Sequence, residues 1–151
     1  MRPLVLSQLV EGIVEDTEIL APEVRVEGNI APGLQVMGDA DLMKQVIQNL
    51  AANAVKYNYK GGFIRMALQA DGQRVRFSIA NSGRGIPPED REKVFTRFYR
   101  GDKARSRTVS GAGLGLSIAR EIVRAHQGEL VLETSSGEQT VFSVTLPRAG
   151  V

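Results

Sequence analysis

Apolar residues recur every three or four positions in three segments of the chain, which predicts three amphipathic helices. The first covers residues 4–20 and ends where Ala21 and Pro22 interrupt the pattern. The second runs from Asp39, a good N-cap residue, to about Tyr57, and the third covers residues 114–126, with Gly128 as its cap. The predicted apolar stripes are Leu42, Val46, Leu50 and Ala54 in the second helix, and Leu114, Ile118, Ile122 and Ala125 in the third.

Between these helices apolar and polar residues alternate, which predicts strands. Short strands are expected at 24–28 and 34–37, a hairpin at 64–68 and 75–79 that turns at Asp71 and Gly72, and a last pair at 130–132 and 142–146 that turns at 135–137. Residues 89–98 indicate a short helix, whereas 99–112 have no periodicity and are expected to form a mobile loop. Helices that cover one face of a mainly antiparallel sheet predict a two-layer α/β sandwich of the α+β class, as one domain over 1–151.

The composition is typical of a globular domain, with 42% hydrophobic and 24% charged residues among 151. The absence of cysteine excludes disulfides, thiolate metal sites and a cysteine nucleophile, and one histidine cannot build a histidine-rich metal site. The chain has no apolar run long enough for a membrane span and no visible signal peptide, and the lack of cysteine is compatible with the cytoplasmic location that we expect. The net charge of +2 does not by itself indicate nucleic-acid binding.

A polar face on the second predicted helix is the first candidate for chemistry. Asn49, Asn53, Lys56 and Tyr57 lie at positions i, i+4, i+7 and i+8, which places them on one side of a helix. Amide oxygens suit Mg²⁺, which keeps several waters and binds largely through substrate phosphates. Lys56 could balance phosphate charge, and Tyr57 could lie against a base or ribose or simply pack. A solvated surface stripe explains the same pattern equally well.

A run of alternate glycines, residues 111–116, precedes the third predicted helix. Glycines allow a ligand to approach the backbone, and a helix that starts there directs free N–H groups toward an anion. We therefore favour a phosphate site over a flexible linker. Basic residues crowd the segment just before it, where a basic lid beside an anionic ligand is favoured over a solvated face: Arg97, Arg100, Lys103, Arg105 and Arg107.

Two further segments carry weaker signals. In residues 81–87 a strand is followed by a turn in which Gly83 and Gly85 would allow close approach of a flat ring while Asn81 reads a base edge, although a tight turn is the simpler interpretation. Phe95 and Phe98, three positions apart, could anchor the base of the basic loop in the core.

These segments, in this order, resemble the catalytic ATP-binding domain of bacterial sensor histidine kinases, in the GHKL superfamily. Residues 49–57 correspond to the N box, 81–86 to the first glycine box, 95–100 to the F box and 111–116 to the second glycine box. Residues 137–140 resemble a last, weaker motif. The resemblance extends over residues 4–147.

The resemblance implies a site for ATP and Mg²⁺. It places Asn53 on the metal, Asn49 near the metal and its waters, Lys56 near the phosphates, Tyr57 near the nucleoside and Asn81 on the adenine amino group. Thr140 would support the adenine from the sheet. The remaining residues implied in ATP binding are Gly83, Gly85, Ile86, Gly111, Gly113, Leu114, Gly115 and Leu116, together with the lid cations Arg97, Arg100, Lys103 and Arg105.

Four positions bear on activity. Asn81 stands where the family usually has Asp, so we expect weaker but real ATP binding, because a neutral hydrogen bond replaces a charge-assisted one. Gln139 replaces a usual glycine, which affects only the Thr140 contact. Asn49 stands where GHKL hydrolases have a Glu that activates water, and an amide has no useful basicity. His126 is disfavoured as a phosphate acceptor and is expected to be partly exposed at a helix end.

The implied function is that of a kinase catalytic domain that presents the γ-phosphate of ATP to a histidine on a separate dimerisation domain, which this chain lacks. A response regulator would be an indirect partner, and the isolated domain is expected to be monomeric, without nucleic-acid or membrane contacts of its own. It could be the cytoplasmic part of a membrane-bound sensor. The alternatives are a nucleotide-binding regulatory module without kinase activity, or a GHKL-type ATPase.

Overall fold

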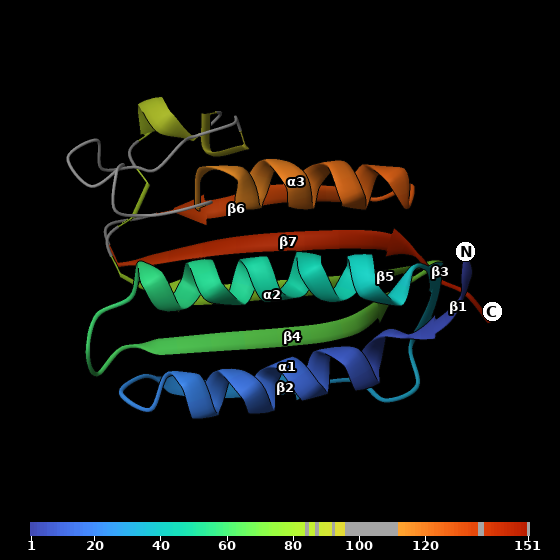
Figure 1. Ribbon diagram of the computed structural model, residues 1–151, viewed down its shortest axis with the longest axis horizontal. Coiled ribbons are helices and arrows are strands. Elements are labelled where there is room, and N and C mark those ends of the chain that lie inside the picture. Colours follow the sequence, from blue (N-terminus) through green and yellow to red (C-terminus); the bar gives the residue numbers. More distant parts are fainter. Residues whose placement is uncertain (84, 87, 92, 96–111, 136–137, 151) are drawn as a thin grey trace.

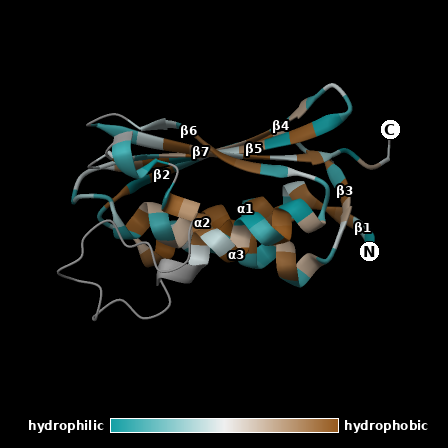
Figure 2. Ribbon diagram, turned by 90° about the horizontal axis from the view of Figure 1, so that it is seen from above, coloured by the Kyte–Doolittle hydropathy of each residue, from teal (hydrophilic) through white to brown (hydrophobic). Residues whose placement is uncertain are grey.

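Two layers, one of strands and one of helices, make up the computed structural model (Figures 1 and 2), which describes residues 1–83, 85–86, 88–91, 93–95, 112–135 and 138–150. The helices of these segments lie on one face of a five-stranded sheet. They are α1 (Leu6–Leu20), α2 (Ala40–Lys56) and α3 (Ala112–Ala125). None of them is long and apolar enough to cross a membrane.

The sheet has the strand order β2-β4-β5-β7-β6. β2 and β4 pair in parallel, and the other neighbouring strands pair antiparallel, so the predicted two-layer sandwich of the α+β class is confirmed. A separate antiparallel ribbon joins β1 to β3. The strands are β1 (Arg2–Val5), β2 (Arg25–Ile30), β3 (Gln35–Gly38), β4 (Phe63–Asp71), β5 (Arg74–Ser82), β6 (Glu129–Ser135) and β7 (Gln139–Pro147).

The central hairpin follows its sequence pattern closely. β4 and β5 pair from Ile64 opposite Asn81 to Asp71 opposite Arg74, and Gly72 takes the positive φ of +64° that the turn needs. Alternate residues of both strands face the helices and form the middle of the core, as predicted: Ile64, Met66, Leu68, Val75, Phe77 and Ile79.

The helical stripes are only partly as predicted. Asp39 caps α2 as expected, because its Oδ1 accepts a hydrogen bond from Leu42 N–H at 3.0 Å. Leu42 itself is 40% exposed, whereas Met43 and Ile47 join Val46, Leu50 and Ala54 in the core. In α3 the predicted Ile118 and Ala125 face solvent, and the buried residues are Ala119, Ile122, Val123 and His126. Both helices have apolar residues on several sides, so contacts with the sheet and with each other select the buried side.

Two predictions about helices are wrong, and a third is right only in part. The first helix starts at Leu6, because residues 2–5 pair with β3. Where one helix was expected over residues 89–98, the described part contains two short 3₁₀ turns, η1 (Pro88–Asp90) and η2 (Lys93–Phe95). Gly128 contributes to the cap of α3 as predicted, because its N–H donates to the Val123 carbonyl at 3.0 Å, but the left-handed residue of this cap is Gln127, at φ +62°. Gly128 is glycine for lack of space, since a Cβ there would lie 2.2 Å from the Thr145 backbone oxygen.

Candidate functional site

The C-terminal end of α2, the N-terminal end of α3 and the end of β5 meet at one end of the domain (Figure 1). The end of β6 and the start of β7 lie at the same end, because both pair there in the sheet. Every predicted site residue that the structure describes belongs to one of these elements or follows one directly. The fold therefore brings together residues that are as far apart in the chain as Asn49 and Thr140.

The polar face of α2 meets the start of α3 through a direct contact. Asn49 Nδ2 donates a hydrogen bond to the Gly115 carbonyl oxygen at 3.4 Å, and both residues are half-buried. A Cβ at position 115 would already touch the Asn49 side chain, at 3.9 Å. Asn53 lies one turn further along the same face and is also half-buried, while Lys56 and Tyr57 are exposed beyond it. The polar face of α2 and the glycine-rich start of α3, both of which the resemblance assigns to the ATP site, are thus in contact.

Gly83 directly follows β5 and packs against the backbone at the end of α2. Its φ is +136°, and a Cβ would lie 2.2 Å from the backbone oxygen of Tyr57. Its N–H donates to the Glu138 carbonyl oxygen at 3.3 Å, so it is held from the β7 side as well. The sequence predicts close approach of a flat ring at this glycine, whereas the close neighbour in the structure is the backbone that follows α2, and only glycine fits there.

Buried polar side chains lie on the neighbouring strands β5, β6 and β7. Asn81 is 5% exposed, and its Nδ2 donates to the Ser82 carbonyl at 2.9 Å. Within the described segments no donor reaches the Asn81 Oδ1, so a buried acceptor is left for a ligand. Thr140 stands opposite Asn81 in the strand register, and its hydroxyl lies 3.3 Å from the Ser135 hydroxyl.

Ser135 is a residue of the candidate site that the sequence analysis does not include. Besides the contact to Thr140, its hydroxyl accepts a hydrogen bond from Ile86 N–H, and its carbonyl accepts one from the Arg91 guanidinium. It thereby ties the segment that follows β5 to the end of β6. The only signal in the sequence is a hydroxyl residue before a glycine turn, which has no specificity.

A second missed network holds the loop after α2 against the sheet. The Ser82 hydroxyl donates to Asn58 Oδ1 at 2.6 Å and accepts from Phe63 N–H at 2.7 Å, and Asn58 Nδ2 donates to the Phe63 carbonyl at 2.8 Å. Gly62 packs so closely here that a Cβ would lie 2.2 Å from Ser82 Oγ. These bonds fix the position of the α2 end that carries Asn53.

Phe95 is the anchor that the sequence predicts. It is 8% exposed, and its ring meets Phe142 edge to face, with centroids 6.0 Å apart and an interplanar angle of 83°. The Arg120 guanidinium lies 4.8 Å from the same ring, so α3 also holds it. The second predicted anchor, Phe98, lies outside the described residues.

Residues 38–150 match the family model described as histidine kinase-, DNA gyrase B- and HSP90-like ATPase. The chain belongs to this family. The sensor histidine kinase WalK of Bacillus subtilis is 42% identical over 116 residues, which cover 76% of this chain and 19% of the relative. The sensor-like histidine kinase SenX3 of Mycobacterium tuberculosis is 35% identical over 125 residues, 83% of this chain and 30% of the relative. The chain thus spans less than a third of these relatives.

Solved structures agree with the sequence relatives. The mycobacterial sensor histidine kinase MprB superposes with a TM-score of 0.85 at 28% identity, covering 97% of this chain and 98% of the other. Full-length ShkA, solved in complex with AMPPNP, gives a TM-score of 0.82 at 28% identity and covers 99% of this chain and 31% of the other. The predicted membership of the catalytic ATP-binding domains of sensor histidine kinases is confirmed.

The other predicted positions of the family motifs fall into those outside and those inside the described residues. The lid cations Arg97, Arg100, Lys103 and Arg105, and Gly111 in the second glycine box, lie outside the described residues. Gly113 and Leu114 belong to the first turn of α3, and Leu116 packs half-buried against the core. Gly85 and Ile86 are half-buried after β5.

The described residues fit Mg²⁺ only if phosphates and waters supply most of its ligands, as the resemblance to the family implies. No group of three or more His, Cys, Asp or Glu side chains in the described segments could hold a metal ion. Asn49 donates from its amide nitrogen to Gly115, and no described residue donates to its carbonyl oxygen. Asn53 adds a second amide oxygen one turn away. Amide oxygens with phosphates and waters suit Mg²⁺, which rarely relies on a cage of protein ligands alone.

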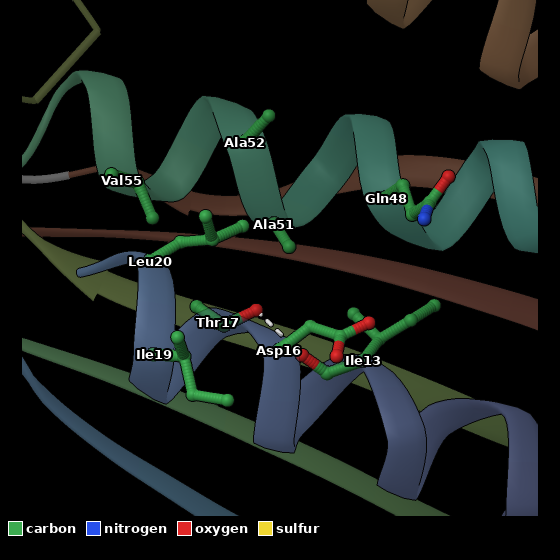
Figure 3. Close-up of a pocket in the computed structure, with 9 residues that line it drawn as sticks. All are labelled: Ile13, Asp16, Thr17, Ile19, Leu20, Gln48, Ala51, Ala52 and Val55. Atoms are coloured by element: carbon green, nitrogen blue, oxygen red, sulfur yellow. Dashed lines mark hydrogen bonds between the residues drawn. The ribbon is translucent and has the colours of Figure 1, made fainter.

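A hollow of about 420 Å³ lies between α1 and α2 (Figure 3), and neither Asn49 nor Asn53 is among its described lining residues. Its lining is mainly apolar, and Asp16 is the one charged side chain among its described lining residues. A triphosphate needs cations or backbone N–H groups, so this groove is unsuited to it. The lining residues are Ile13, Asp16, Thr17, Ile19, Leu20, Gln48, Ala51, Ala52 and Val55.

Proposed function

We propose that this domain binds MgATP between the C-terminal half of α2 and the N-terminus of α3, and presents the γ-phosphate to a histidine side chain of a separate dimerisation domain. The observation that carries the proposal is the contact between Asn49 and Gly115. It joins the amide face of α2, formed by Asn49 and Asn53, to the start of α3 that would receive phosphate. Family membership and the sensor histidine kinase relatives support the same assignment.

The base would lie against the buried polar side chains of β5, β6 and β7. The buried Asn81 Oδ1 would accept a hydrogen bond from the adenine amino group, because Nδ2 is already used on the Ser82 carbonyl. Thr140 and Ser135 would support the base from the neighbouring strands. This pairing favours adenine over guanine, whose corresponding position is a carbonyl acceptor.

The phosphates would meet positive groups from two helices. The N–H groups at the start of α3 and the ammonium of Lys56 would offset their charge, and Asn53 and Asn49 would hold Mg²⁺. When bound, the metal neutralises charge on the phosphate oxygens. Asn49 carries no basic group that could activate water, so the site favours transfer over hydrolysis.

Transfer forms a bond between an imidazole nitrogen and the γ-phosphorus and breaks the bond from that phosphorus to the β,γ-bridging oxygen, which leaves with ADP. The imidazole proton passes to a base on the partner domain. This chain therefore needs only to position and to neutralise charge, which is the main requirement of phosphoryl transfer. The lid cations Arg97, Arg100, Lys103 and Arg105 remain predictions for contact with the γ-phosphate.

The test has two steps. Titration calorimetry should show that MgATP binds the wild-type domain, that Asn53→Ala weakens binding about tenfold, and that the control Asn29→Ala, an exposed residue of β2, does not. The domain is then mixed with a dimerisation domain and labelled ATP. Labelled histidine supports the kinase, and binding without transfer supports a regulatory module. ATP turnover by the isolated domain that Asn49→Ala abolishes would favour a hydrolase.

The remaining partners follow from the same proposal. A response regulator would receive the phosphate from the dimerisation domain rather than from this one. The isolated domain is expected to be a monomer in the cytoplasm, or in the cytoplasmic part of a membrane-bound sensor. Light scattering after size exclusion, with and without the dimerisation domain, tests the monomer.

A further inference from the structure

His126 is buried, contrary to the partly exposed position predicted for it. It is 5% exposed at the C-terminal end of α3. Its Nδ1 lies 2.8 Å from the Ile122 carbonyl oxygen, and its Nε2 lies 3.1 Å from the backbone nitrogen of Asp39. A carbonyl can only accept and a backbone N–H can only donate, so Nδ1 carries the proton and Nε2 is bare. Both ring nitrogens of a neutral imidazole are therefore used.

The ring connects two helix ends that are 87 residues apart in the chain. Asp39 is the N-cap of α2, and His126 follows the last residue of α3, where Gln127 N–H and Gly128 N–H bond back to Arg124 and Val123 carbonyls at 3.0 Å each. The backbone before Asp39 lies so close to the ring that a Cβ on Gly38 would be 2.9 Å from its Cδ2. The ring thus fills a narrow, fixed space.

The same two helices meet again at the opposite end, where Asn49 bonds to Gly115. α2 carries the amide face, and α3 offers its N-terminus to phosphate. A shift of α3 along its axis would move that N-terminus relative to Asn53, and the bond from His126 to Asp39 resists such a shift. The apolar contacts of Ala119 and Ile122 in the core also hold α3, and the hydrogen bond adds a restraint with a fixed direction.

We infer that His126 is a positioning residue for the nucleotide site. Its neutral imidazole fixes α3 against the N-cap of α2, and this contact sets the distance between Asn53 and the phosphate-binding end of α3. The inference rests on the proposed function, because it concerns the geometry of that site. His126 touches no substrate and acts through the placement of α3.

Three variants distinguish a role of His126 in the placement of α3 from a role in the stability of the domain alone. His126→Phe fills the same volume without hydrogen bonds, and His126→Gln keeps an acceptor long enough to reach Asp39 N–H. Thr17→Val is the matched control: Thr17 is 4% exposed, and its hydroxyl bonds to the Ile13 carbonyl at 2.7 Å within α1, so its loss lowers stability without touching the contact between α2 and α3.

The affinity for a fluorescent ATP analogue with Mg²⁺ is measured at a temperature at which all variants are folded. We expect His126→Phe to bind about fivefold more weakly, the equivalent of one lost hydrogen bond, and His126→Gln and Thr17→Val to bind within about twofold of wild type. Equal affinity of wild type and His126→Phe, or an equal loss in Thr17→Val, would overturn the positioning role.

Nitrogen NMR of the single imidazole provides a readout that does not depend on nucleotide. The expected result is a protonated Nδ1 and a bare Nε2 that is coupled to the Asp39 amide proton. The opposite tautomer would overturn the inference whatever the affinities. If the tautomer is as expected but wild type binds no nucleotide, the proposed function fails, and the positioning role fails with it.

Discussion

Replacement of Gly83 by alanine tests how the end of β5 supports the site. At φ +136° a side chain is strained by about 1–3 kcal/mol. The new Cβ would also lie 2.2 Å from the Tyr57 backbone oxygen, and relief of such overpacking costs about 1–3 kcal/mol more. We therefore expect Gly83→Ala to lower the free energy of unfolding by about 4 kcal/mol, as the sum of the two penalties.

Gly72→Ala is the matched control. Gly72 also has a positive φ, +64°, but a Cβ there would meet nothing within 4 Å, so the substitution should cost only about 1–2 kcal/mol. Urea unfolding of both variants measures the difference. Because the displaced backbone follows α2 directly, Gly83→Ala should also weaken binding of an ATP analogue about tenfold at a temperature where it remains folded, and Gly72→Ala should not. Equal unfolding free energies, or unchanged affinity in Gly83→Ala, would refute the reasoning.

Three further substitutions have defined outcomes. Asn81→Asp would set a carboxylate oxygen against the carbonyl that the amide now bonds, so the nucleotide-free domain should lose about 1–3 kcal/mol in urea unfolding; unchanged stability would contradict the assigned amide orientation. Gly128→Ala should lose about 2 kcal/mol in the same assay, because its Cβ would collide with the Thr145 oxygen, and a neutral result would show that the turn after α3 yields easily. Arg76→Met removes the pair with Glu133, both about 30% exposed, and should change stability by less than about 1 kcal/mol, with unaltered nucleotide affinity.

The local pattern of the sequence is sufficient for much of the fold. Alternation in β4 and β5, with Gly72 at the turn, predicts the hairpin and its buried side, because a strand has only two faces and one of them is apolar. Asp39 is recognisable as a cap, since capping depends on residues three positions apart. The family boxes are likewise short segments, so their order along the chain predicts the family, which the match over residues 38–150 confirms.

Contacts between distant segments decided the rest. The buried sides of α2 and α3 exclude Leu42 and Ile118, because a helix has many possible faces and its neighbours choose among them. The contact between Asn49 and Gly115, the support of Thr140 by Ser135 and the burial of His126 against Asp39 each join residues that are remote in the chain or on different elements. Residue types and spacing specify helices, strands and turns, because those depend on near neighbours. The pairing of one helix end with another depends on how all layers pack at once, and only the tertiary structure contains it.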